Sequence, residues 1–220
     1  MKTKRGGGRP RVLTEEQIGQ AVKEVGWTDL TFRAISSKLK VGATTLFRYA
    51  PNRDALSRMG MDAVLKDVKW PKAQDSWKET MRSWAMTAWD VFAQYPGVAH
   101  DYEQGIISPK MSIVAAEAAY YLVSKGFTTT QAALIVNSVF DLVASKRSMA
   151  DFFERESSLF SDLKTLNSNI LLDHEIPEEF KEEFTEVFVN AFSSRADRAT
   201  TESILNVILE GCEKCYSREV

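Results

Sequence analysis

Cysteine and histidine are scarce in this chain. Two of its 220 residues are cysteines, Cys212 and Cys215, and two are histidines. Two cysteines are too few for a disulfide framework. We expect them to pack at an interface on an apolar helix, in preference to binding zinc or acting in redox chemistry. The chain also lacks HExxH, a glycine-rich phosphate loop, a nucleophile elbow and a Glu-x-x-His pair. We therefore predict a protein that is not an enzyme and uses no metal or cofactor.

Long apolar runs are missing as well. Charges interrupt every apolar stretch before it reaches the ~18 residues that a bilayer-spanning helix needs. The basic N-terminus has no apolar segment of the kind found in secretory signals. We therefore expect no membrane association and a cytoplasmic location.

The net charge of −2 conceals two regions of opposite sign. Residues 1–70 carry 14 Lys and Arg against 7 Asp and Glu, whereas residues 71–220 carry 14 against 23. A basic region followed by an acidic one indicates that the first meets a polyanion. Residues 1–12 add five basic residues, three consecutive glycines and no acid. We predict a flexible arm there, which either follows DNA phosphates or remains a solvated tail.

Helix signals begin at Thr14 and continue to the C-terminus. Thr14 and Gln17 form a capping box, and Gly26 ends the apolar stripe that follows. Thr31 is a predicted N-cap, and Pro51 stops a third short helix before Asn52 caps a fourth. These signals predict helices over about 14–25, 31–39, 43–49 and 52–68.

The second half of the chain shows the same helical pattern. Capping residues and turns predict helices over about 76–95, 98–104, 108–126, 128–155, 177–192 and 201–216, with 156–175 ambiguous. No stretch alternates like a strand. The predicted fold is all-α, with an N-terminal three- or four-helix domain over 13–70 and a larger helical domain over 71–220. Pro71 marks the expected boundary.

The N-terminal helices carry a recognisable motif. It runs from Val25-Gly26-Trp27 and Leu30-Thr31-Phe32-Arg33 through Leu39-Lys40-Val41 and Thr45-Leu46-Phe47-Arg48-Tyr49 to Asn52-Arg53. This stretch resembles, without a gap, the DNA-binding domain of the TetR (tetracycline repressor) family, and the resemblance covers about 50 residues in all. The Tyr95-Pro96-Gly97 corner is similar to that of the tetracycline-repressor C-terminal domain. The resemblance implies a helix-turn-helix whose second helix enters the major groove.

The resemblance also implies which residues contact operator DNA. They are Arg33, Ala43, Thr44, Thr45, Phe47, Arg48, Tyr49 and Arg53. Methyl groups at 43–45 suit thymine, and an arginine at 33 or 48 suits guanine. Two positions depart from the family pattern. Phe47 replaces a tyrosine that contacts phosphate, and Lys40 replaces a turn glycine. A left-handed Lys40 would cost on the order of 1 kcal/mol.

The C-terminal domain is expected to form a homodimer and to hold an effector. Helices 128–155 and 201–216 are apolar on more than one face, and the resemblance implies that they form a four-helix bundle with a second copy. That geometry matches a palindromic operator with half-sites about 34 Å apart. The expected effector-binding residues, several of them also ordinary core candidates, are Trp84, Ala88, Phe92, His100, Tyr102, Tyr120, Asn137 and Asp141.

Polar residues within the apolar helices also support the expectation of an effector site. Asn137, Ser138 and Asp141, together with Glu117, interrupt apolar runs, and a buried carboxylate needs a partner. The resemblance argues against tetracycline with magnesium, because the predicted helix 53–68 lacks histidine, and a small, largely apolar or aromatic effector fits better. The sequence thus predicts a DNA-binding transcriptional repressor released by that effector. The alternative is a helix-turn-helix regulator without a small-molecule effector, constitutive or partnered by a protein.

Overall fold

The computed structural model describes residues 13–156, 177 and 197–216, and the regular secondary structure among these residues is α-helix, with no strand. This confirms the all-α fold class. The basic arm at 1–12, almost all of the ambiguous segment 156–175 and the helix expected after Pro177 lie outside the described residues. None of the described helices combines the length and apolarity that a bilayer crossing requires.

The N-terminal region contains four short helices, three of which begin at a cap that the sequence predicts. They are α1 (Glu15–Val25), α2 (Phe32–Leu39), α3 (Ala43–Phe47) and α4 (Arg53–Lys66). Thr14 forms the full capping box, and the side chains of Thr31 and Asn52 accept hydrogen bonds from backbone N–H groups of the first turns of α2 and α4. Each cap satisfies a donor that the helix would otherwise leave unpaired.

A close contact between α1 and α4 forms the centre of this region. Ile18 and Val22 of α1 are fully buried, as is Leu56 of α4. Gly60 allows the approach, because a Cβ there would lie 2.4 Å from Cγ1 of Val22. Ion pairs Lys66–Glu16 and Lys23–Asp67 lie at the edge of the same contact. The pair of helices therefore forms a rigid base for α2 and α3.

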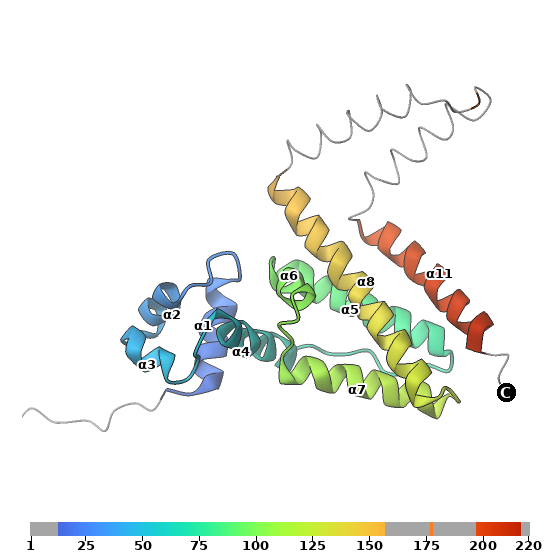
Figure 1. The fold of residues 1–220 in the computed structure, drawn as a ribbon, viewed down its shortest axis with the longest axis horizontal. Helices are drawn as coiled ribbons and strands as arrows, with labels where there is room; N and C mark the ends of the chain where they lie inside the picture. Colours follow the sequence, from blue (N-terminus) through green and yellow to red (C-terminus); the bar gives the residue numbers. More distant parts are fainter. Residues whose placement is uncertain (1–12, 157–176, 178–196, 217–220) are drawn as a thin grey trace, which may run out of the picture.

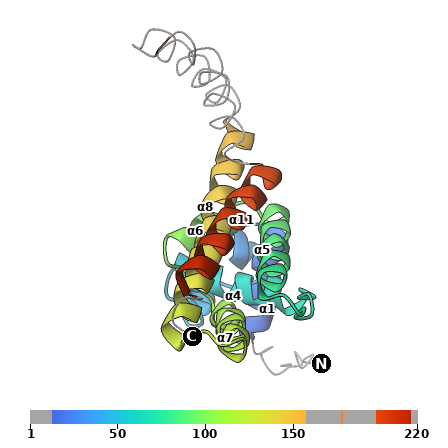
Figure 2. The same ribbon diagram turned by 90° about the vertical axis from the view of Figure 1, so that its right-hand side faces the viewer.

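The C-terminal region is built around one long helix. Its helices are α5 (Trp77–Gln94), α6 (Val98–Glu103), α7 (Pro109–Ser124), α8 (Thr129–Arg155) and α11 (Arg198–Tyr216). α8 packs against α5, α6, α7 and α11, and α4 reaches this group through α7 and α6. Figure 1 shows α2 and α3 at one end of the molecule and α11 at the other, and Figure 2 shows α11 lying along α8.

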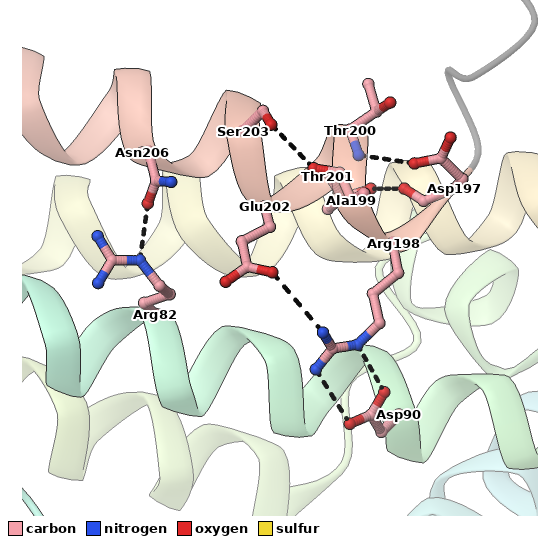
Figure 3. A network of polar contacts seen from close by, with 10 residues as sticks. All are labelled: Arg82, Asp90, Asp197, Arg198, Ala199, Thr200, Thr201, Glu202, Ser203 and Asn206. Carbon is pink, nitrogen blue, oxygen red and sulfur yellow. Dashed lines mark hydrogen bonds and ion pairs between the residues drawn. The ribbon is translucent and has the colours of Figure 1, made fainter.

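A polar seam joins α5 to α11 (Figure 3). Arg82 donates to Asn206 at 2.7 Å, and Arg198 pairs with Asp90 at 3.2 Å. Nearer the C-terminus, Lys78 contacts two glutamates of α11. Exposed pairs of this kind contribute little stability individually. Their spacing along both helices instead defines the register in which α11 lies on α5.

Candidate functional site

The turn between α2 and α3 has the tight geometry of a helix-turn-helix. Lys40 ends α2 in the left-handed region, with φ of 55° and ψ of 43°. It is the one non-glycine residue with positive φ among those described. The N–H of Val41 donates to the carbonyl of Ser36, which closes the helix end. The turn therefore keeps its shape despite the lysine, at the conformational cost expected from the sequence.

The outer surface of α3 carries most of the predicted DNA contacts. Leu46 is fully buried and anchors the helix on the domain core. Ala43, Thr44 and Thr45 are exposed, and so are Phe47 and Arg48 one turn later. Residues separated by three or four positions share a helix face. The predicted reading residues therefore form one continuous exposed stripe.

The basic side chains beside this stripe differ in whether a carboxylate pairs with them. Arg33 and Arg48 are exposed and form no ion pair with any described residue. Tyr49 is partly buried and packs against the core. Arg53, in contrast, donates from Nη1 to both carboxylate oxygens of Asp101, at 2.9 and 2.8 Å. A DNA phosphate at Arg53 would therefore compete with a carboxylate on α6.

Asp101 is the centre of a buried hydrogen-bonded chain between the two regions. Its side chain is 4% exposed. Besides the arginine, it accepts a hydrogen bond from Oγ of Ser57 at 2.6 Å, and Ser57 accepts one from Nε1 of Trp27 at 2.8 Å. Sequence analysis did not identify this network. Its members lie 44 and 48 positions apart along the chain, and no local pattern links them.

Two further contacts connect the regions near the Tyr95-Pro96-Gly97 corner and at α7. The N–H of Gly97 donates to Asp151 of α8 at 2.9 Å, and Arg147 pairs with that same carboxylate. Gly97 has φ of 96° and packs against Trp27, where a Cβ would lie 3.0 Å from the tryptophan Cβ. At α7, the N–H of Lys110 donates to Asp62 of α4. α4 is thus in direct contact with α6 and α7, and the corner before α6 is in turn held by α8.

The expected effector residues separate into distinct environments. Trp84, Ala88 and Phe92 lie in the buried core of α5, and Nε1 of Trp84 donates to the carbonyl of Pro71. Phe92 faces Tyr102 with ring centroids 6.2 Å apart. These residues occupy the interior position that the sequence predicts, but they are packed core side chains.

Tyr102 and Asp141 come together at a pocket of about 410 Å³. Ile107 and Ser145 also line it. Burial, followed by the negative charge of Asp141, raises the pKa of Tyr102 to about 12. The phenol is therefore neutral at physiological pH and is a hydrogen-bond donor at the wall of a pocket that also carries the carboxylates of Asp141 and Glu103.

His100 lies elsewhere, in an open cleft of about 900 Å³ between the two regions. Its walls come from the loop after α1, from the start of α4, from α6 and from the C-terminal part of α8. Trp27, Arg53 and Asp101 belong to the same walls. His100 therefore lines a different hollow from Tyr102, although the two hollows share Glu103 and Ser145, and it lies at the contact between the regions.

The polar residues expected to interrupt the apolar faces of the long helices are not buried within the single chain. Asn137 and Asp141 are exposed, and so is Glu117. Tyr120 is 77% exposed on the outer face of α7. α7 buries Met111, Val114, Ala118 and Leu122, which places Tyr120 on its opposite side. Each helix is apolar on more sides than one chain covers, so periodicity alone did not identify the buried side. Their roles in effector binding stay predictions.

The described helices offer no site suited to metal binding or thiol chemistry. Within the described ranges, no cluster of three or more His, Cys, Asp or Glu side chains is placed to hold a metal ion. Burial raises the pKa of the Cys212 thiol, which lowers its thiolate fraction. This cysteine is therefore poorly suited to act as a nucleophile.

Comparisons with known proteins give structural relatives only. No family model matches the chain, and no curated protein sequence matches it. Apo ActR from Streptomyces coelicolor is similar in structure with a TM-score of 0.72 and 19% identity, covering 91% of this chain and 98% of that one. ActR is described as a TetR family protein, and its complex with actinorhodin gives a TM-score of 0.70 and 17% identity, covering 96% and 100%.

A second relative comes from another organism. A TetR variant from Acinetobacter baumannii AYE, solved with minocycline, gives a TM-score of 0.62 and 17% identity, with 92% of each chain covered. These matches extend over both regions of the chain, from the helix-turn-helix to α11. The protein therefore has the fold of TetR-family transcriptional regulators.

Proposed function

We propose that this protein is a sequence-specific transcriptional repressor of the TetR family, released from a palindromic operator by a small, largely apolar or aromatic effector. The observation that carries the proposal is the exposed stripe on α3, flanked by Arg33 and Arg48, which form no ion pair with the described residues. An exposed helix with methyl-bearing side chains and free guanidinium groups suits the edges of bases in a major groove about 12 Å wide.

A homodimer is part of this proposal. α11 buries Thr201, Leu205 and Leu209 against its own chain, yet Val207 on the other side is 72% exposed. Leu134 on α8 is 51% exposed. Apolar residues left uncovered on two adjacent helices favour burial against a partner. A second copy of the same surfaces would give the two-fold symmetry that a palindromic site requires.

The Tyr102 pocket is the proposed effector site. It offers a neutral phenol, two carboxylates and the apolar side chains of Ile107 and Ala144, which suits a ligand with an apolar body and a few polar atoms. The structures of ActR with actinorhodin and of TetR with minocycline support a small-molecule effector, because each of these proteins was solved with a small molecule bound. In a dimer, Asn137 and Asp141 lie on a helix face that the partner could cover.

Release would act through Asp101. The α6 carboxylate holds Arg53 and Ser57 at the start of α4, so a ligand that moves α6 also moves α4. The effector shifts the population toward the form in which the two recognition helices no longer match successive grooves. A shift from 1% to 99% release requires binding to that form to be tighter by about 5.5 kcal/mol.

The exposure of Tyr120 and Asn137 favours one alternative function. A regulator without a small-molecule effector, constitutive or partnered by a protein, would leave these polar surfaces open to solvent or to the partner. An effector screen on the operator-bound dimer separates the two functions. Displacement by a compound supports the repressor–effector proposal, and displacement by no compound supports the alternative.

The first test is selection of bound sequences from random duplex DNA at ~150 mM salt, where non-specific phosphate contacts are weakened. We expect a palindrome to be enriched, and we expect Arg48→Ala to relax the preference at one base pair of each half-site. Lys72→Ala is the matched control, because Lys72 is an exposed cation outside the helix-turn-helix. Only salt-sensitive binding without enrichment would contradict the proposal.

A further inference from the structure

An aromatic pair occupies the DNA-facing end of the molecule. The rings of Phe32, at the start of α2, and Phe47, on α3, stack with centroids 4.1 Å apart and planes at 13°. Phe47 remains 50% exposed, and it is the one large hydrophobic side chain between residues 13 and 70 that is exposed. An exposed phenylalanine held in place by a second ring is not explained by the packing of the domain itself.

The exposed ring is restricted in what it can contact. A phenyl group has no hydrogen-bond donor or acceptor, so it gains nothing from a phosphate and would strip water from it. It lies one turn beyond Ala43, and the exposed methyl group of Ala43 is on the same side of the helix. The two side chains therefore extend one apolar patch along the helix that faces the groove.

The base edges in the major groove carry one distinctive apolar group that such a patch can contact. That group is the 5-methyl of thymine, which phenylalanine and alanine side chains contact in protein–DNA complexes. Because the Phe32 ring restrains the Phe47 ring, little side-chain freedom is lost when the contact forms. Arg48, next along the stripe, is free of ion pairs with described residues and can take the neighbouring base or phosphate.

We propose that Phe47, held by its stack on Phe32, is a specificity-determining residue that reads a thymine through its 5-methyl group in each operator half-site. The inference rests on the proposed DNA-binding function and deepens it. It assigns a base preference to a position where a hydroxyl-bearing side chain would instead hold the backbone. The alternative location for the ring is the deoxyribose of the backbone, which carries no sequence information.

The test removes single methyl groups from the DNA. Each thymine of the selected operator is replaced in turn by deoxyuridine, and dissociation constants are measured by fluorescence anisotropy for the full-length protein. For the wild type, one position per half-site loses affinity by about fourfold, the size expected for one buried methyl group. Phe47→Ala binds the unmodified operator more weakly and no longer distinguishes the two bases at that position. Phe47→Tyr adds a hydroxyl that would hold the backbone instead, so it should also weaken the distinction.

The control is Phe152→Ala, which removes another exposed phenylalanine remote from α3. It should retain the full deoxyuridine effect, and thermal unfolding should show that Phe47→Ala is folded. If the operator binds normally but no thymine is coupled to Phe47, the inference is overturned and the ring lies on the sugar. If no sequence is selected at all, the proposed function fails and the inference falls with it.

Discussion

The helix-turn-helix region and the long C-terminal helices expose apolar side chains in different ways. In the first, one exposed aromatic residue, Phe47, lies within a stripe of small and basic side chains. In the second, Val207 and Leu134 lie on the exposed sides of α11 and α8, whose other sides already pack against their own chain. The first pattern suits a charged, grooved partner such as DNA. The second suits a large apolar surface, which a second copy of the chain provides.

The largest expected effect separates these two surfaces. Val207→Asp places one charge from each copy in the proposed dimer contact, where both charges would be desolvated. We expect a monomer in sedimentation velocity, with unchanged helix content by circular dichroism. Operator affinity should fall by about 100-fold or more, because the second half-site no longer binds as part of one molecule.

Val123→Asp is the control for that experiment. Val123 is 39% exposed on α7, outside the two helices proposed to form the interface. It should leave both the dimer and operator affinity unchanged. If the Val207→Asp protein is a dimer and the Val123→Asp protein is a monomer, α7 forms the interface in place of α8 and α11.

The next effect lies at the contact between the two regions. Asp101→Asn removes the charge that faces Arg53 in a nearly buried site, although the arginine side chain is 41% exposed. We expect the free energy of unfolding, from urea titration, to fall by about 2 kcal/mol. Operator affinity should change little, because Arg53 is then free for a phosphate. Arg53→Ala should lose both the ion pair and the phosphate contact, and so weaken operator binding about tenfold.

Asp90→Asn supplies the comparison for that variant. Asp90 pairs with Arg198 on α11, with both side chains about half exposed (Figure 3). A solvent-exposed pair of this type is worth less than about 1 kcal/mol. Equal losses of operator affinity in Asp101→Asn and Arg53→Ala would show that Arg53 positions α4 without touching DNA.

The smallest effect concerns Tyr102 and is absent at neutral pH. Burial raises the pKa of this phenol from 10.0 to about 12, so the unfolded chain loses its proton first. Its contribution to stability is therefore fully present below pH 10 and is lost as pH rises through 12. Ultraviolet difference titration should show a late phenolate step that Tyr102→Phe removes and Asp141→Asn moves to lower pH. A Tyr102 step near pH 10 would contradict burial of the ring.

Local sequence predicted the helix ends well. The caps at Thr14, Thr31 and Asn52 are present in the structure, and so is the proline at the start of α7. Capping depends on side chains within three residues of one another, and such contacts can be read without knowledge of the fold. Burial along α8 could not be read in the same way. Its apolar residues extend round the helix, so Asn137 was expected inside and lies outside.

The ion pair between Arg53 and Asp101 shows the same limit at the candidate site. The resemblance assigned the arginine to phosphate, and nothing near it in sequence indicated Asp101 as a partner. The pairing arises because α6 packs across the start of α4, which brings together residues 48 positions apart. The stack of Phe32 on Phe47 arises similarly from the angle between α2 and α3.

The amino-acid sequence by itself determined the helices, their caps, the separation of a basic from an acidic region and the order of the helix-turn-helix. These follow from propensity, charge and contacts within one or two turns, which act before any tertiary packing. Only the tertiary structure decided which apolar faces remain uncovered, which arginine is held by a carboxylate and which aromatic ring is left exposed beside α3. Those outcomes depend on which helices meet and at what angle, because burial and pairing are properties of the packed assembly of helices.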